Sequence, residues 1–293
     1  MNIRNWVTLV SIAVCAFGCS AKNSAEHSIE NPYGLHPGEW QFVKDGTNDL
    51  GVAPQKDGEN DCGPNVATWV FRQSKAATGD YEAFRDVCLR QLPNYLQSPE
   101  FAAGLKTQAA ALAPTDPAAL LLNALADAIG KLPPEQISML SFGTLPPDLT
   151  TQMNAFGKTS TPPLAFQLRT EANTTDIVSA VAAGRPVIVL GDMQLFHPAA
   201  APPPELAAVA DLLKGFPVLH YLVVVGTSRD AVTGDPLFAV RNTDNSILAL
   251  DEHRFLLAWT TRQPNELPAV KALLDVLQIK SNTMIDAVST PSR

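Results

Sequence analysis

The chain is poor in cysteine and in positive charge, and each shortage excludes a class of protein. Four cysteines among 293 residues are too few for a disulfide-dense scaffold, and no C-x-x-C pair offers a zinc site. The 21 Lys and Arg residues are outnumbered by 29 Asp and Glu, and the sequence has no basic cluster. Because phosphate contacts dominate nucleic-acid affinity, we expect no nucleic-acid partner.

The sequence also lacks a Walker loop, a G-x-G-x-x-G motif and internal repeats. Apolar residues are plentiful at 46%, and charged residues make up 17%, which excludes a disordered chain. The chain is long enough to bury a large core. We therefore expect a folded protein whose function must be sought in individual residues.

The first residues have the pattern of a targeting segment. Residues 1–18 carry an early positive charge, the apolar run Trp6–Phe17 and then small residues, as a secretory signal does. The run is short for a membrane-spanning helix. Ala16-Phe17-Gly18-Cys19 resembles a bacterial lipobox, in which Cys19 is lipidated; ordinary cleavage nearby is the alternative. Residues 19–40 are polar, as a flexible tether would be, so we expect an exported protein held at the cell envelope by a lipid anchor alone.

The first half of the mature chain predicts helices. Apolar residues recur at helical spacing over Cys62–Ala77, Tyr81–Leu96 and Pro117–Leu132. The last segment is apolar nearly all round, so we expect it to be buried. Proline pairs at 133–134, 146–147 and 162–163 should each stop a helix.

The second half predicts strands between short helices. The expected strands are Val187–Leu190, Leu219–Gly226, Leu237–Arg241 and Ser246–Leu250. The expected helices are Thr175–Ala183, Glu205–Gly215, Asp251–Trp259 and Ala269–Ile279. Helices first and a mostly antiparallel sheet later indicate the α+β class.

Cys62 and His220 are the candidates for chemistry. Cys62 begins a predicted helix, whose dipole and free N–H groups stabilise a thiolate. His220 interrupts a buried apolar strand, which is a rigid position for the base that a thiol nucleophile needs. The next strand ends in Asn242-Thr243-Asp244, so either Asn242 or Asp244 is suited to orient the imidazole.

Other cysteine, histidine and tryptophan residues have plainer interpretations. Cys88 lies on the apolar face of a predicted helix and is expected in the core. A Cys62–Cys88 disulfide is an alternative that an oxidising compartment permits and that would abolish nucleophilic chemistry. Trp69 and Trp259 are expected in the core, and His197 and His253 on the surface.

Three segments together carry a resemblance to a family. Asn60–Pro64, Gly184–Val189 and His220–Gly226 resemble the peptidase C39-like family of the papain-like cysteine peptidase superfamily, and the likeness spans about Val52 to Trp259. It implies a papain-like fold, with an N-terminal helical half packed on a mostly antiparallel C-terminal sheet. The domain would occupy residues 41–285, with insertions at 97–170 and 197–216.

The resemblance also implies a reaction. It predicts a thiol hydrolase that cleaves a peptide or amide bond through Cys62, His220 and Asn242, with Asp244 as the alternative third member. The family uses a Gln shortly before the nucleophile as an oxyanion donor, a place that Gln55 takes at a spacing one residue longer than usual. No cofactor or metal is expected, and the partner is a peptide or amide substrate. Two alternatives stay open: an inactive C39-like lipoprotein that only binds, and an acyl or peptidyl transferase.

Overall fold

The computed structural model describes residues 40–43, 52, 54–55, 61–74, 76, 81–129, 131, 143–192, 219–230, 232–262 and 266–288. The expected signal segment with Cys19, the tether before Trp40, His197 and the predicted helix Glu205–Gly215 lie outside these residues. Among the described residues, no helix has the length and apolar character needed to cross a membrane.

Helices fill the first part of the described chain. They are α2 (Cys62–Gln73), α3 (Tyr81–Leu96), α4 (Pro99–Ala110), α5 (Pro117–Ile129) and α7 (Pro146–Thr159). The helix predicted over Tyr81–Leu96 is confirmed with both ends, and those predicted from Cys62 and Pro117 are confirmed with earlier ends. Helix α4 was not predicted, although Ser98 caps it by accepting a hydrogen bond from the Phe101 N–H.

Two helical predictions are wrong in an instructive way. The prolines at 146–147 do not stop a helix but begin α7, because Pro fits the first turn, where its missing N–H costs nothing. Helix α5 is not buried all round: it buries one face, and Leu120 on another face is 58% exposed. An apolar composition alone therefore overstated the burial of α5.

The sheet is antiparallel throughout the described residues. Its strands are β1 (Gln41–Phe42), β2 (Ala165–Arg169), β3 (Val187–Asp192), β4 (Leu219–Arg229), β5 (Pro236–Arg241), β6 (Ile247–Asp251) and β7 (Met284–Val288). The order is β2-β7-β3-β4-β5-β6, and β1 pairs with β4. The predicted strands at β3 to β6 are confirmed, whereas β1, β2 and β7 had no prediction. The α+β class is confirmed.

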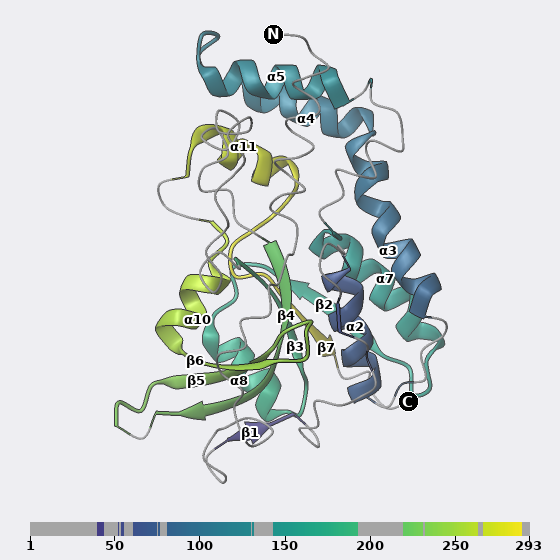
Figure 1. Ribbon diagram of the computed structural model, residues 1–293, viewed down its shortest axis with the longest axis vertical. Helices are drawn as coiled ribbons and strands as arrows, with labels where there is room; N and C mark the ends of the chain where they lie inside the picture. The colour runs from purple at the N-terminus through teal and green to yellow at the C-terminus, as the bar shows by residue number, and fades with distance from the viewer. Residues whose placement is uncertain are drawn as a thin grey trace.

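Helices cover both sides of this sheet. In Figure 1, α2, α3 and α7 lie to the right of β3 and β4, and α8 (Thr174–Ala182) and α10 (Glu252–Trp259) lie to the left of these two strands. Helices α4 and α5 form a pair at the top of the view, beside α11 (Pro268–Val276). Trp69 and Trp259 are buried, as expected, and His253 is exposed.

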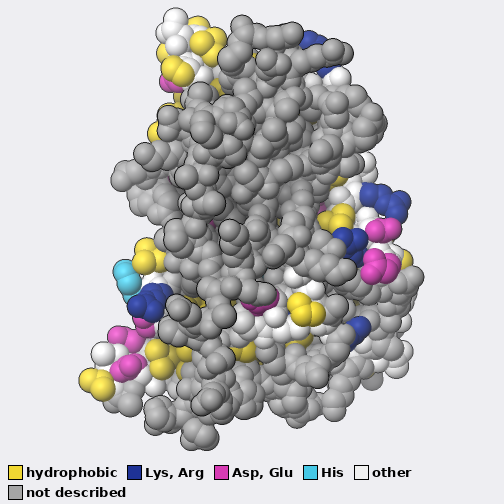
Figure 2. Space-filling model, viewed as in Figure 1, with side chains coloured by type: hydrophobic (Ala, Val, Ile, Leu, Met, Phe, Trp, Pro, Cys, Tyr) yellow, Lys and Arg dark blue, Asp and Glu magenta, His cyan; other side chains and the backbone are white. Residues whose placement is uncertain are grey.

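The outward surface of α3 carries charges of both signs, which lie together over that helix in Figure 2. Arg85 pairs with Glu82 and Arg90 with Asp86, three and four residues apart along α3. These spacings place each pair on one face of a helix. The opposite face of α3 carries the buried residues Phe84, Cys88 and Leu92.

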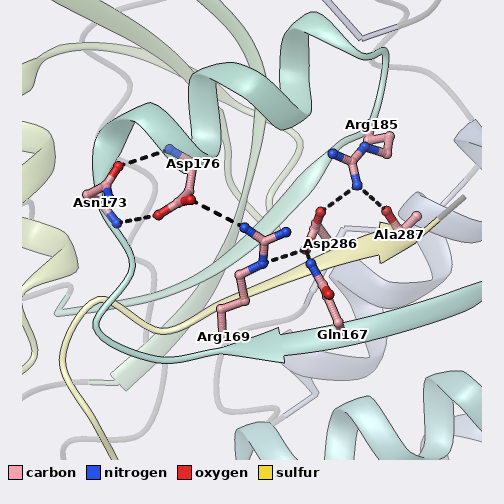
Figure 3. A network of polar contacts seen from close by, with 7 residues as sticks. All are labelled: Gln167, Arg169, Asn173, Asp176, Arg185, Asp286 and Ala287. Atoms are coloured by element: carbon pink, nitrogen blue, oxygen red, sulfur yellow. Dashed lines mark hydrogen bonds and ion pairs between the residues drawn. The ribbon is translucent and has the colours of Figure 1, made fainter.

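A polar network joins β2, β7 and the segment before β3 at one end of the sheet (Figure 3). Asp286 of β7 is buried and accepts hydrogen bonds from Arg185 at 2.8 Å and from Gln167 of β2 at 3.1 Å. The Nε of Arg169 lies 3.8 Å from the same carboxylate. Two guanidinium groups thus compensate a charge that would otherwise be costly to bury. This end of β3 is opposite to the end that pairs with His220.

Candidate active site

Helix α2 begins directly after Asp61, whose side chain is paired with an arginine. The Asp61 carbonyl accepts the first helical hydrogen bond, from the Asn65 N–H at 2.8 Å. The Asp61 carboxylate lies 3.1 Å from the Arg85 Nε of α3. Cys62 is the first residue of the helix and is 2% exposed. The positive end of the helix dipole therefore lies at the Cys62 sulfur, as the sequence predicted.

Gly63 allows the start of α2 to approach β4. A Cβ atom at this position would lie 3.2 Å from the ring of Tyr221, which is tighter than ordinary contact. Tyr221 is buried, and its hydroxyl donates to the Thr144 carbonyl at 2.8 Å. This close approach brings Cys62 against the strand that carries His220.

His220 and Asn242 are brought together by adjacent strands. His220 is 1% exposed and lies at the start of β4, where it pairs with Gly191 of β3. Asn242 follows the last residue of β5, the next strand in the sheet. The Asn242 Oδ1 lies 2.8 Å from the His220 Nε2, and the Thr243 Oγ1 lies 3.2 Å from the same nitrogen.

The hydrogen bonds around Asn242 define the proton on the imidazole. The Thr243 backbone N–H donates to the Asn242 Oδ1 at 2.8 Å, so this oxygen is an acceptor. The His220 Nε2 must then carry a proton to hydrogen-bond with it. The Nδ1 is the nitrogen left to exchange a proton with a thiol.

The Cys62 side chain contacts His220 and changes its acidity. Burial alone lowers the pKa of His220. A hydrogen bond with Cys62 and the negative charge of its sulfur act in the other direction, followed by the hydrogen bond to Asn242 and the charge of Asp244. These contacts outweigh burial, and the pKa of His220 lies above its ordinary value. The surroundings of His220 therefore favour its protonated form more than water does.

Asp244 accepts a hydrogen bond within the same turn. Its Oδ1 accepts a hydrogen bond from the Ser246 N–H at 2.8 Å. Its charge still contributes to raising the pKa of His220, as the last of the contributions named above. Of the two candidate orienting groups, Asn242 is thus the one that the structure brings to the imidazole nitrogen.

The backbone of Gln55 is hydrogen-bonded to the turn that follows Asn242. Its backbone N–H donates to the Thr243 carbonyl at 3.0 Å, and the residue is half-buried. The segment before α2 is thereby tied to the turn that carries Asn242. Both of the regions that the sequence linked to catalysis, around Gln55 and around Asn242, share this contact.

Cys88 is separate from the site. It is 0% exposed within α3, and burial together with the charge of Asp148 raises its pKa to about 12. Cys62 and Cys88 are both free thiols, so the alternative of a disulfide between them is wrong. Among the described residues, no group of three or more His, Cys, Asp and Glu side chains could hold a metal ion.

A small cavity adjoins the sulfur. It has a volume of about 10 Å³ and is bordered by Cys62, Leu145, Leu190 and Tyr221 among other residues. This volume holds about one water molecule. Apart from Cys62, the side chains named are apolar or aromatic, so the space beside the sulfur has a low dielectric, which strengthens electrostatic interactions there.

Sequence reasoning missed two polar residues around this site. Arg241 is fully buried next to Asn242, and its guanidinium lies over the Trp69 ring, 5.4 Å from the ring centroid. Thr243 places its hydroxyl and its N–H on the His220–Asn242 pair. The position of Arg241, a charged residue at the end of the apolar strand Leu237–Arg241, could have indicated its importance. Nothing in the sequence around Thr243 indicated a comparable role.

Comparisons with known proteins give little further detail. No family model and no curated protein matches this chain. Among solved structures, the chain is similar to a Bacillus anthracis protein whose description proposes a C39-like peptidase. The TM-score is 0.30 at 15% sequence identity, and the match covers 51% of this chain and 62% of the other. The matched part thus spans less than two thirds of that protein.

Proposed function

We propose that this protein is a papain-like cysteine hydrolase that cleaves a peptide or amide bond. In this proposal Cys62 is the nucleophile, His220 the general base and acid, and Asn242 the group that orients the imidazole. The Gln55 side chain and the Cys62 N–H bind the oxyanion. Support for the papain-like fold comes from a nucleophile at a helix start that faces a His and an Asn on an antiparallel sheet.

One observation carries the proposal. The Asn242 Oδ1 holds the His220 Nε2 at 2.8 Å while the Cys62 side chain hydrogen-bonds the same ring. A nucleophile, a base and an orienting group connected in this sequence are the signature of an activated thiol. A structural cysteine in a core needs neither an imidazole nor an amide behind it.

The reaction follows from these positions. The Cys62 thiolate attacks the carbonyl carbon, a C–S bond forms, and the carbonyl electrons move to the oxygen. As the tetrahedral species collapses, the C–N bond breaks and the His220 imidazolium gives its proton to the departing amine. Water then attacks the thioester carbon, and His220 takes the proton from that water as the C–O bond forms. The C–S bond breaks, the acid product leaves, and the Cys62 thiolate is restored. An amine in place of the water would make the protein a transferase.

Oxyanion stabilisation is the part assigned to Gln55 and to the start of α2. The N–H groups of the first helical turn have no carbonyl partner within the helix, and in this proposal the Cys62 N–H donates to the oxyanion. A single donor of this kind lowers the reaction barrier by about 3 kcal/mol. The bond between the Gln55 N–H and the Thr243 carbonyl supports the assignment, because it anchors Gln55 beside the turn of Asn242.

Thiol labelling tests the proposal. Iodoacetamide should alkylate Cys62 at pH 6, where an ordinary thiol with a pKa of about 8.5 is almost fully protonated. Peptide mass spectrometry identifies the labelled residue, and the Cys62→Ala variant is the control. A Cys62 no more reactive at pH 6 than free cysteine would contradict the proposal.

A binding protein without catalysis is the second candidate. The observation in its favour is the burial of Cys62 beside a cavity of about 10 Å³, which gives a substrate carbonyl little room at the sulfur. Alkylation at pH 6 discriminates between the two, since a reagent the size of iodoacetamide must reach the sulfur to react.

We also propose that the chain is exported and anchored through Cys19. The support is the lipobox-like segment at residues 16–19. In a bacterial host, labelled palmitate should enter the wild-type chain but not the Cys19→Ala variant. Equal labelling of both would contradict the anchor without affecting the proposal for Cys62.

A further inference from the structure

Arg241 occupies an unusual place for a charged side chain. It is 0% exposed at the end of β5, one residue before Asn242, and its backbone pairs with Val223 of β4 and Ile247 of β6. Burying a guanidinium is costly, so a buried arginine must be held by specific contacts. Its contacts reach the three segments that carry the proposed site.

The first contact reaches the helix of Cys62. The Arg241 guanidinium lies over the Trp69 ring at 5.4 Å from its centroid. A cation over an aromatic face is attracted most strongly where both are desolvated, and both residues are buried. Trp69 lies seven residues after Cys62 in α2, so the two side chains are on the same side of that helix.

The second contact reaches the turn and the segment before α2. The Arg241 guanidinium donates to the Asn245 Oδ1. The Asn245 Nδ2 in turn donates to the Val52 carbonyl at 3.3 Å, three residues before Gln55. The turn itself is closed by the Asn242 N–H donating to the Ser246 carbonyl at 2.9 Å.

We propose that Arg241 is a positioning residue, which joins the helix of Cys62 to the turn of Asn242 and so holds the sulfur and the imidazole at reacting distance. The inference rests on the proposed function and names a determinant of it. Arg241 acts through Trp69 and Asn245 and does not touch the substrate. A rigid clamp of this kind matters because displacement by about 1 Å can slow a reaction by about a hundredfold.

Two variants weaken the clamp in different ways. Arg241→Lys keeps the charge but loses the planar fork that contacts Trp69 and Asn245 together. Asn245→Gly removes the amide between Arg241 and Val52. Asn245 has a positive φ of 70°, which glycine adopts freely, so this variant keeps the turn.

Arg185→Lys is the matched control. Arg185 is a partly buried arginine in the network around Asp286, and its variant should lower stability. Arg185 precedes the first residue of β3. Gly191, which pairs with His220, lies near the other end of that strand. A variant that acts only through stability will behave like this control.

The readout is the ratio of the Cys62 alkylation rate at pH 6 to that at pH 10. An ordinary thiol is ionised at pH 10, so the ratio measures the thiolate that the imidazole sustains at low pH. The charges that act on His220 are those of Cys62 and Asp244. The charges of Cys62, Asp148 and Cys88 act on Tyr221, which follows His220 in β4, and Asp61 is paired with Arg85 at the start of α2. None of them is changed by the variants.

We expect Arg241→Lys and Asn245→Gly to lower the ratio by about tenfold, and Arg185→Lys to leave it unchanged. Thermal melts and circular dichroism establish that each variant is folded. If Arg241→Lys and Asn245→Gly lower stability but keep the wild-type ratio, Arg241 is structural only and the inference is wrong. A wild-type ratio equal to that of free cysteine overturns the proposed function, and this inference with it.

Discussion

The two buried cysteines of the described chain have opposite surroundings. Cys62 is at the first residue of α2 and contacts the imidazole of His220. Cys88 lies inside α3, where burial and the charge of Asp148 raise its pKa to about 12. The two thiols are almost equally inaccessible, at 2% and 0% exposure. Burial therefore does not distinguish the two thiols; their positions along a helix and the charges beside them do.

The largest effect should come from removing the Cys62 sulfur. We expect Cys62→Ala to abolish both labelling by iodoacetamide at pH 6 and any hydrolysis of peptide substrates, because the nucleophile is lost. Cys88→Ala should keep both. Mass spectrometry of the labelled peptides and a peptide-release assay measure the two outcomes. Labelling of Cys88 in place of Cys62 in the wild type at pH 6 would contradict the expectation that Cys62 is the more reactive thiol.

Removing the imidazole should make Cys62 behave more like an ordinary thiol. His220→Gln should slow alkylation of Cys62 at pH 6 by about a hundredfold, within the range for loss of a general base. At pH 9 the difference should shrink, since a thiol ionises there without help. The rate at Cys88 should not change at either pH. If the alkylation rate of Cys62 in His220→Gln equals that of the wild type at both pH values, His220 does not act as the base.

Asn242 and Asp244 should differ in the size of their effects. The hydrogen bond that the His220 ring donates to Asn242 and the charge of Asp244 both raise the pKa of His220, in that order of importance. Asn242→Ala should therefore bring the loss of the imidazolium to lower pH and slow turnover by about tenfold or more, because the ring is also less well held. Asp244→Asn should give a smaller shift in the same direction. The pH dependence of labelling measures both.

The smallest effect concerns stability. Because the pKa of folded Cys88 lies above that of an unfolded thiol, at about 12 against about 8.5, the protonated thiol favours the folded state. Its contribution is complete below about pH 8.5 and is lost as the pH rises toward 12, at about 1.4 kcal/mol per pH unit. Urea unfolding between pH 8 and pH 10 should show this decline in the wild type. Cys88→Ser, which does not titrate there, should show a flatter dependence.

Local patterns in the sequence were enough to predict the elements that carry chemistry. The start of α2 at Cys62 follows from Pro64 in the first turn and from apolar residues at helical spacing. Strand β4 follows from its continuous apolar run around His220. Each signal lies within one short stretch of sequence, so no knowledge of distant contacts was needed to interpret it.

Elements whose stability depends on partners were not predicted. Strand β2 pairs with β7 across residues 165–169 and 284–288, which are short segments with no distinctive pattern. The proline pair at 146–147 was interpreted as a stop, although the same local chemistry also suits the start of α7. Which of two such alternatives holds depends on what packs against the segment.

The sequence by itself determined that a cysteine begins a helix and that a histidine lies in a buried strand, because helix and strand periods are local properties. Only the tertiary structure decided that Asn242 and not Asp244 meets the His220 nitrogen, that Cys88 stands apart, and that Arg241 lies against Trp69. These outcomes depend on strand pairing and on the distance between segments far apart in the chain. Such distances are set when the core closes, and no short stretch of sequence contains them.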